Sequence, residues 1–139
     1  MPCTYYVTIP GDRPFFWSIA SFLWGPNPSF DSDGDSIPAD SSTWTELTLH
    51  LRDGQGHCVK GERVDVDPYQ EHPLILQVRS ETASLALRVG YVLARFTGGR
   101  LSAAPDGPFR DPNEYESELG QEFDLSQALE HFYQALRRS

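Results

Sequence analysis

One short segment of this 139-residue sequence carries residue types whose spacing points directly to chemistry. Residues 31–40 read DSDGDSIPAD, with aspartates at alternate positions around a glycine. Such spacing places carboxylate oxygens on one side of a tight loop, and Ca²⁺ prefers hard oxygen ligands of this kind. We therefore take Asp31, Asp33 and Asp35 as candidate calcium ligands.

The same segment resembles the loop of thrombospondin type-3 calcium repeats, which share the pattern D-x-D-G-D-x-I-P. Those repeats occur in tandem, whereas this sequence contains one copy. Ser36 stands where the repeats usually have glycine, and Ser41 and Ser42 supply no late carboxylate of the kind that completes an EF-hand loop. These departures favour the alternative, a solvated acidic loop without a bound ion.

Four histidines and two cysteines are the other residues with metal-binding or catalytic chemistry. No C-x-x-C or H-x-x-x-H spacing supports a zinc site, and the adjacent His57 and Cys58 would point to opposite faces of a strand. A Cys58 nucleophile with His50 or His72 as base lacks a marked orienting residue and an oxyanion loop. Phosphate-binding and G-x-S-x-G motifs are absent from the sequence. We therefore predict a protein without catalytic residues or cofactors.

Charge is the strongest compositional signal. Lys and Arg number 11 against 20 Asp and Glu, for a net charge of -9, and the excess lies in residues 30–47 and 111–139. This balance argues against nucleic acids and anionic membranes as partners, because both are bound through Lys and Arg. It favours an acidic surface that steers a basic protein partner, with a merely solubilising surface as the alternative. The candidate contact residues are Asp31, Asp33, Asp35 and Asp40 in the first segment and Glu114, Glu116, Glu118 and Glu122 in the second.

Trp44 is the aromatic residue that we single out as a partner anchor. It lies where a polar loop meets a predicted strand, so partial exposure is expected. Tryptophan is enriched among the residues that dominate binding energy at interfaces.

The elements that must position these residues follow from periodicity and turn residues. Strands are expected over 4–9, 45–52, 58–66, 74–79 and 100–104. Helices are expected over 15–24, from a cap at Ser80 to a stop at Gly98, from the capping sequence at Asp111, and over 125–138. The run 15–24 is apolar on nearly every side, so buried strand remains an alternative there. Residues 45–66 alternate around a turn at 53–56 and predict a β-hairpin.

This order predicts an α+β fold, an antiparallel or mixed sheet with helices mainly on one face. We expect a single domain over 1–139, with a polar acidic loop at 25–43 and an acidic helical segment at 111–139. The two cysteines, Cys3 and Cys58, are expected to be reduced in a cytoplasmic protein without a leader. The longest apolar run is half of what a membrane span requires.

The middle of the chain resembles small bacterial immunity proteins of contact-dependent and type VI polymorphic toxin systems. The resemblance rests on the hairpin from Trp44 to Val66, on PLILQVRS at 73–80 and on LARFTGGRL at 93–101. It implies a non-catalytic binding protein that neutralises a cognate toxin by occluding its active or activation site. Its partner would be a toxin with a basic surface, and the protein itself a monomer or weak dimer. An adaptor, a chaperone or an anti-defence binding protein is the alternative.

Overall fold

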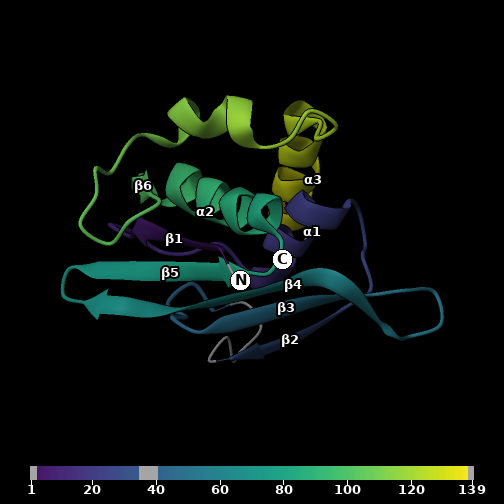
Figure 1. Ribbon diagram of the computed structural model, residues 1–139. Helices are drawn as coiled ribbons and strands as arrows, with labels where there is room; N and C mark the ends of the chain where they lie inside the picture. The colour runs from purple at the N-terminus through teal and green to yellow at the C-terminus, as the bar shows by residue number, and fades with distance from the viewer. Residues whose placement is uncertain (1–2, 35–40, 138–139) are drawn as a thin grey trace.

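A computed structural model describes residues 3–34 and 41–137 (Figure 1). Strands and helices are interspersed along this part of the chain. The strands are β1 (Cys3–Thr8), β2 (Phe30–Gly34), β3 (Leu47–Arg52), β4 (Cys58–Glu71), β5 (Leu74–Ser80) and β6 (Leu101–Ser102). The helices are α1 (Phe16–Trp24), α2 (Ala83–Thr97), the 3₁₀ helix η1 (Pro112–Glu118) and α3 (Leu125–Arg137).

The strands form one antiparallel sheet with the order β2-β3-β4-β5-β1-β6. Helix α2 packs on β1, β4 and β5, while α1 contacts β3 and α2. Helix α3 packs on α1, and η1 packs on α2. All of these helices therefore lie on one side of the sheet, as Figure 1 shows, and the predicted α+β fold is confirmed.

Alternation along the strands explains why the helices lie on this side. The inward residues of the strands are apolar and buried, whereas their outward neighbours are mostly charged or polar. The inward set is Val7, Leu47, Leu49, Val64, Val66, Leu76 and Val78. Because side chains alternate between faces, this pattern gives the sheet one apolar face, which α2 and α1 bury.

Helix α1 resolves the ambiguity of the apolar run at 15–24. It lies between the sheet and α3, so nearly all of its surface needs apolar side chains. The indole N–H of Trp17 donates to the carbonyl of Ala135 at 3.2 Å and joins α1 to α3. The helical prediction for this segment is confirmed.

Two local predictions are wrong. The expected loop at 25–43 contains strand β2, in which Phe30 packs against Phe16 and Trp24, so tertiary pairing overrides the poor strand propensity of aspartate and glycine. Ser80 does not cap α2, because Thr82 is the N-cap residue. The Ser80 hydroxyl instead donates to the carbonyl of Arg63 at 2.6 Å and ties β5 to β4.

The end of α2 depends on two adjacent glycines. Gly98 takes the left-handed conformation with φ 79°, and the N–H groups of Gly98 and Gly99 both donate to the carbonyl of Ala94. The backbone of Gly99 then passes so close to β1 that a Cβ atom at this position would lie 1.8 Å from the carbonyl oxygen of Thr8. Only glycine fits where the chain turns from α2 toward β6.

We predict that Gly99→Ala destabilises the protein by about 3 kcal/mol, because the added methyl group collides with backbone rather than with a movable side chain. Urea unfolding followed by circular dichroism measures the change. The matched control is Gly54→Ala in the hairpin turn, where nothing lies within 4 Å of an added Cβ. Equal stability of the two variants would contradict the prediction.

Candidate functional site

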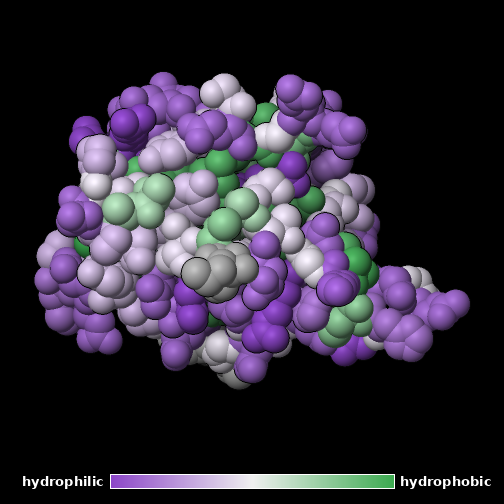
Figure 2. All heavy atoms as spheres, in the orientation of Figure 1, coloured by the Kyte–Doolittle hydropathy of each residue, from purple (hydrophilic) through white to green (hydrophobic). Residues whose placement is uncertain are grey.

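The face of the sheet opposite the helices is not covered by any described element, and it carries ordered rows of polar side chains. Strand register aligns Asp33, Thr48, Asp65 and Arg79 across β2, β3, β4 and β5. Directly opposed residues on one face have Cβ atoms about 5 Å apart, so these side chains meet. In the side view, the sheet side of the molecule is mostly hydrophilic (Figure 2). We call this surface the open face.

Acidic residues gather in a shallow hollow on the open face. The hollow has a volume of about 350 Å³, and four carboxylate side chains and one arginine carry its charge. These residues are Asp33, Glu46, Asp65, Asp67 and Arg79, and we call the site the acidic hollow. It combines residues from β2, from the entry to β3, and from β4 and β5, which are distant in the sequence.

Hydrogen bonds hold two of these carboxylates in place. Asp65 Oδ1 accepts from the Thr48 hydroxyl at 2.7 Å and from Arg63 Nη2 at 3.2 Å. Asp67 Oδ2 accepts from Arg79 Nη2 at 3.1 Å. The other oxygen of Asp67, Oδ1, is buried and accepts no hydrogen bond from the described residues. A buried acceptor without a donor costs about 1–3 kcal/mol. Because this oxygen is closed to solvent, a partner side chain does not reach it without a rearrangement of the hollow.

A large β-bulge lies beside the hollow. Residues 59–62 of β4 face a single residue of β3, and Gly61 has a φ of 82°. Side chains hold this segment from different directions. Thr82 Oγ1 donates to the carbonyl of Gly61 at 2.6 Å, His50 Nε2 lies 3.1 Å from the carbonyl of Val59, and Trp24 Nε1 donates to Glu62 at 2.8 Å. Bulges of this kind re-aim side chains beside binding sites.

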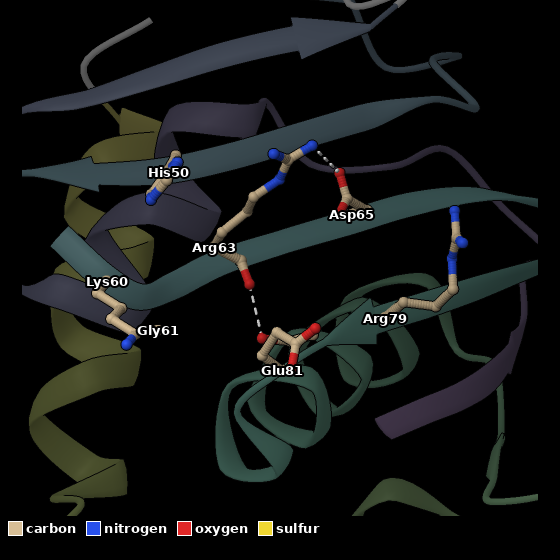
Figure 3. Close-up of a pocket in the computed structure, with 8 residues that line it drawn as sticks. His50, Lys60, Gly61, Arg63, Asp65, Arg79 and Glu81 are labelled. Atoms are coloured by element: carbon tan, nitrogen blue, oxygen red, sulfur yellow. Dashed lines mark hydrogen bonds and ion pairs between the residues drawn. The ribbon is translucent and has the colours of Figure 1, made fainter. Parts of the chain in front are cut away.

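The bulge forms one wall of a second depression, a groove of about 450 Å³ (Figure 3). Its lining residues are His50, Lys60, Gly61, Arg63, Asp65, Arg79, Ser80 and Glu81, and we call it the bulge groove. Asp65 and Arg79 line both the groove and the acidic hollow. The two depressions are therefore neighbours on the open face.

Two of the three predicted calcium ligands lie in a strand rather than in a tight loop. Asp31 and Asp33 lie in the extended strand β2, and Asp31 Oδ2 pairs with Arg52 Nη2 at 2.5 Å. The hydrogen bond from Arg52 lowers the pKa of the Asp31 carboxyl. Asp35, the third predicted ligand, and Asp40 lie outside the described residues. Within residues 3–34 and 41–137, no three His, Cys, Asp or Glu side chains are placed to hold a metal ion.

The histidine and cysteine candidates are dispersed along the sheet. Cys58 is the first residue of β4, and His72 directly follows the end of that strand. The two residues therefore lie a whole strand apart, and no cleft gathers them with His50. The Cys58 thiol donates to Asp31, with Sγ and Oδ2 3.8 Å apart. His57 lies in the exposed turn before β4. Within residues 3–34 and 41–137, no hydrogen bond joins the Cys58 thiol to a histidine that could act as its base.

The second group of predicted contact residues lies on the other side of the molecule. Figure 1 shows η1 above α2, on the side of the helices, whereas β2 lies at the sheet edge below. Glu114 completes the predicted capping box with Asp111, and Glu116 accepts from Tyr91 at 2.8 Å and pairs with Arg95 at 3.7 Å. Glu118 and Glu122 are exposed. The two acidic segments therefore do not form one continuous acidic surface.

Trp44 is not the exposed anchor that we predicted. Its side chain is only 1% exposed, and its indole N–H donates to the carbonyl of Pro14 at 2.9 Å. Arg13 Nε donates to the Trp44 carbonyl at 2.8 Å and fixes the backbone as well. Burial of the large ring beside the start of α1 explains why a tryptophan next to a polar loop belongs to the core.

Sequence reasoning missed three of the four carboxylates of the acidic hollow, Glu46, Asp65 and Asp67, and also Arg79. The signal was present in the alternation of β4, where Val64 and Val66 point inward and the intervening aspartate points outward. The alternation does not reveal which strands flank β4. Only the strand order brings Asp33 and Asp65 onto one row, with Thr48 between them.

No protein-family model, curated protein or solved structure was found to match this chain. Among the helices of residues 3–34 and 41–137, none combines the length and apolar character needed to cross a membrane.

The Tyr91 contact with Glu116 predicts a stability change at alkaline pH. Burial and the hydrogen bond to Glu116 raise the pKa of Tyr91 to about 12, from 10.0. Because the unfolded chain loses this proton first, the contribution of Tyr91 is complete below pH 10 and is lost as the pH rises toward 12. The free energy of unfolding of the native protein, relative to Tyr91→Phe, should fall by about 2 kcal/mol across that window.

Urea titrations of both proteins at several alkaline pH values measure this difference. The control is the same comparison near neutral pH, where the difference between the two proteins should not change with pH. Parallel curves up to pH 12 would contradict the assigned role of Tyr91.

Proposed function

We propose that this chain is a non-catalytic binding protein that neutralises a toxin by covering its active or activation site with the open face. The acidic hollow receives a Lys or Arg side chain of the toxin. This proposal joins the resemblance to immunity proteins of polymorphic toxin systems to a specific surface of the molecule. In this proposal the acidic hollow, rather than the two acidic segments at 30–47 and 111–139, is the contact site for the partner.

The observation that carries the proposal is the grouping of four carboxylate side chains around one arginine in the acidic hollow. A lysine ammonium or an arginine guanidinium would be surrounded there by carboxylates, and hydrogen bonds already orient those of Asp65 and Asp67. Hydrogen bonds that involve charged groups contribute about 1.5–3 kcal/mol, more than neutral ones. A hollow of about 350 Å³ accommodates a side chain of this size.

The position of the hollow favours a protein partner over a small molecule. It is shallow and lies within a broad sheet surface rather than in a deep apolar pocket of the kind that small ligands use. Strand pairing holds the backbone on both sides of Asp65, so binding orders little of the chain. Preorganised surfaces bind more tightly for the same area because less freedom is lost.

The acidic hollow is a better candidate than the acidic helix η1. Glu114 and Glu116 already serve intramolecular contacts, with the η1 backbone and with Tyr91 and Arg95 respectively. Their carboxylates stabilise the fold, and a partner would have to compete for them. In the hollow, by contrast, four carboxylate side chains line the site with one arginine, so negative charge is in excess.

The experiment begins with capture of a partner by the native protein, followed by purification of that partner and measurement of its binding and its inhibition. We predict that Asp33→Lys slows association about tenfold and flattens its dependence on salt, because charged patches set the rate of encounter. The matched control is Glu118→Lys, the same charge reversal on the exposed surface of η1. Surface plasmon resonance over a range of salt concentrations measures both variants.

Asp67→Asn tests one carboxylate of the acidic hollow separately, because it keeps the shape of the side chain and removes its charge. Affinity for the partner should fall about tenfold, while urea unfolding checks that the fold is intact. Inhibition of the partner's toxic activity should weaken in the same order as binding. If Glu118→Lys is the damaging variant and the hollow variants bind normally, the proposed site is wrong.

A further inference from the structure

We propose that the free edge of β2 is a docking site for an extended segment of a protein partner, which adds a further strand to the sheet. The strand order places β2 and β6 at the two edges. The β6 edge is closed, because Leu101 and Arg110 exchange backbone hydrogen bonds of 2.9 Å. Among residues 3–34 and 41–137 only β3 pairs with β2, which is the lowest strand in Figure 1. This inference goes beyond the proposed function, which places a partner on the open face and assigns nothing to the edge.

The backbone of β2 directs hydrogen-bonding groups away from the sheet at Phe30 and Ser32. The N–H of Arg52 donates to the carbonyl of Ser29 at 2.8 Å, so these opposed residues are a hydrogen-bonded pair of the antiparallel ladder. Such pairs alternate along a strand, so Asp31 turns its N–H and C=O toward β3, whereas Phe30 and Ser32 turn theirs outward. The outward groups have no backbone partner in the described part of the chain. They are therefore available to a strand that pairs with this edge.

The two sides of the edge differ in chemistry, and this difference determines which strand fits. On the open face, Asp33 is exposed and makes no ion pair with another described residue. Its Oδ1 accepts from the Gly34 N–H at 2.8 Å, which leaves Oδ2 for a partner. On the helix side, Phe30 lines a hollow of about 330 Å³ together with Trp17 and Pro28. Directly opposed residues have Cβ atoms about 5 Å apart, so the edge matches a strand with a basic residue beside Asp33 and an apolar residue beside Phe30.

Charge argues against a second copy of this chain as the occupant. Two β2 strands paired antiparallel bring Asp31 and Asp33 of one copy beside those of the other, and like charges that oppose each other destabilise a strand pair. Asp31 is already paired with Arg52, so only the position beside Asp33 requires a cation. Charged residues protect edge strands from self-association in this way, and here they leave the edge selective for a basic strand.

The test uses the whole ¹⁵N-labelled protein and, as the probe, the peptide Thr-Lys-Val-Thr-Leu-Thr blocked at both ends. Paired antiparallel to β2, this peptide places its lysine beside Asp33 and its leucine beside Phe30. The N–H groups of its valine and leucine then face β2, whereas the N–H of its lysine points away from the sheet. We expect saturable shifts of the Phe30 and Ser32 amide signals and slower exchange of both amides with deuterium.

Methylation of single peptide nitrogens distinguishes strand pairing from attraction by charge alone. N-methylation of the valine removes a donor to the edge and should weaken binding about tenfold. The matched control is N-methylation of the lysine, which should bind like the unmodified peptide because its nitrogen makes no contact with β2.

Variants of the protein test the same contacts from the other side. Ser32→Pro removes an outward N–H and should abolish binding, whereas Ser32→Ala keeps the N–H and should bind normally. Proline is tolerated on edge strands where the N–H faces solvent, and urea unfolding checks that the variant is folded. If it is not folded, the methylated peptides decide. Replacement of the peptide lysine by glutamine should weaken binding to the native protein about threefold and leave binding to Asp33→Asn unchanged.

Absence of saturable shifts at the edge amides would overturn the proposal. Equal binding of the two methylated peptides, or shifts confined to Asp65 and Asp67, would overturn it by showing that the acidic hollow attracts the lysine without strand pairing. Protection of the Phe30 and Ser32 amides that rises with protein concentration, without peptide, would identify a second copy as the occupant instead. No toxin enters the experiment, so its failure would leave the toxin-binding proposal to its own test.

Discussion

Burial of one face of the sheet is the constraint on which the rest of the structure depends. The inward residues of β1, β3, β4 and β5 are mostly apolar, and α2 and α1 lie on them. Once that side is committed to the core, strict alternation commits the other side to solvent. The charged residues at Asp65, Asp67 and Arg79 are outward for this reason, and their arrangement into rows follows from strand register rather than from proximity in the sequence.

The sequence allowed the fold class to be predicted, because hairpin alternation at 45–66 and the apolar stripe of α2 are strong local signals. The confirmed capping box at Asp111 is equally local. Strand β2 could not be predicted, because its aspartates and glycine disfavour a strand and Phe30 is held by contacts with α1. The predicted exposure of Trp44 was wrong for a related reason. The burial of a side chain depends on what packs over it, and the neighbours of Trp44 in the sequence do not reveal this.

The sequence indicated an acidic surface, but it did not indicate where the carboxylates of the acidic hollow gather. Net charge and the two acidic segments favoured a basic partner, but η1 and β2 lie on different sides of the molecule. The acidic hollow takes only Asp33 from the predicted contact residues and obtains its other carboxylates from Glu46 and β4. Separation in sequence concealed this grouping, because a long-range strand order creates it and no local period encodes such an order.

The bulge in β4 shows why net charge is a poor guide to local chemistry in this protein. A regular strand would continue the pairing of β3 with β4 past His50, and Lys60 would take its place in a flat row. The extra residues instead turn the chain at Gly61, and Thr82 and Trp24 hold the turn against two different helices. A groove with both basic and acidic side chains therefore forms beside the acidic hollow, and the two depressions share Asp65 and Arg79. The open face thus presents both signs of charge. Such a surface discriminates between partners more sharply than a uniformly acidic one, because a mismatch places like charges together.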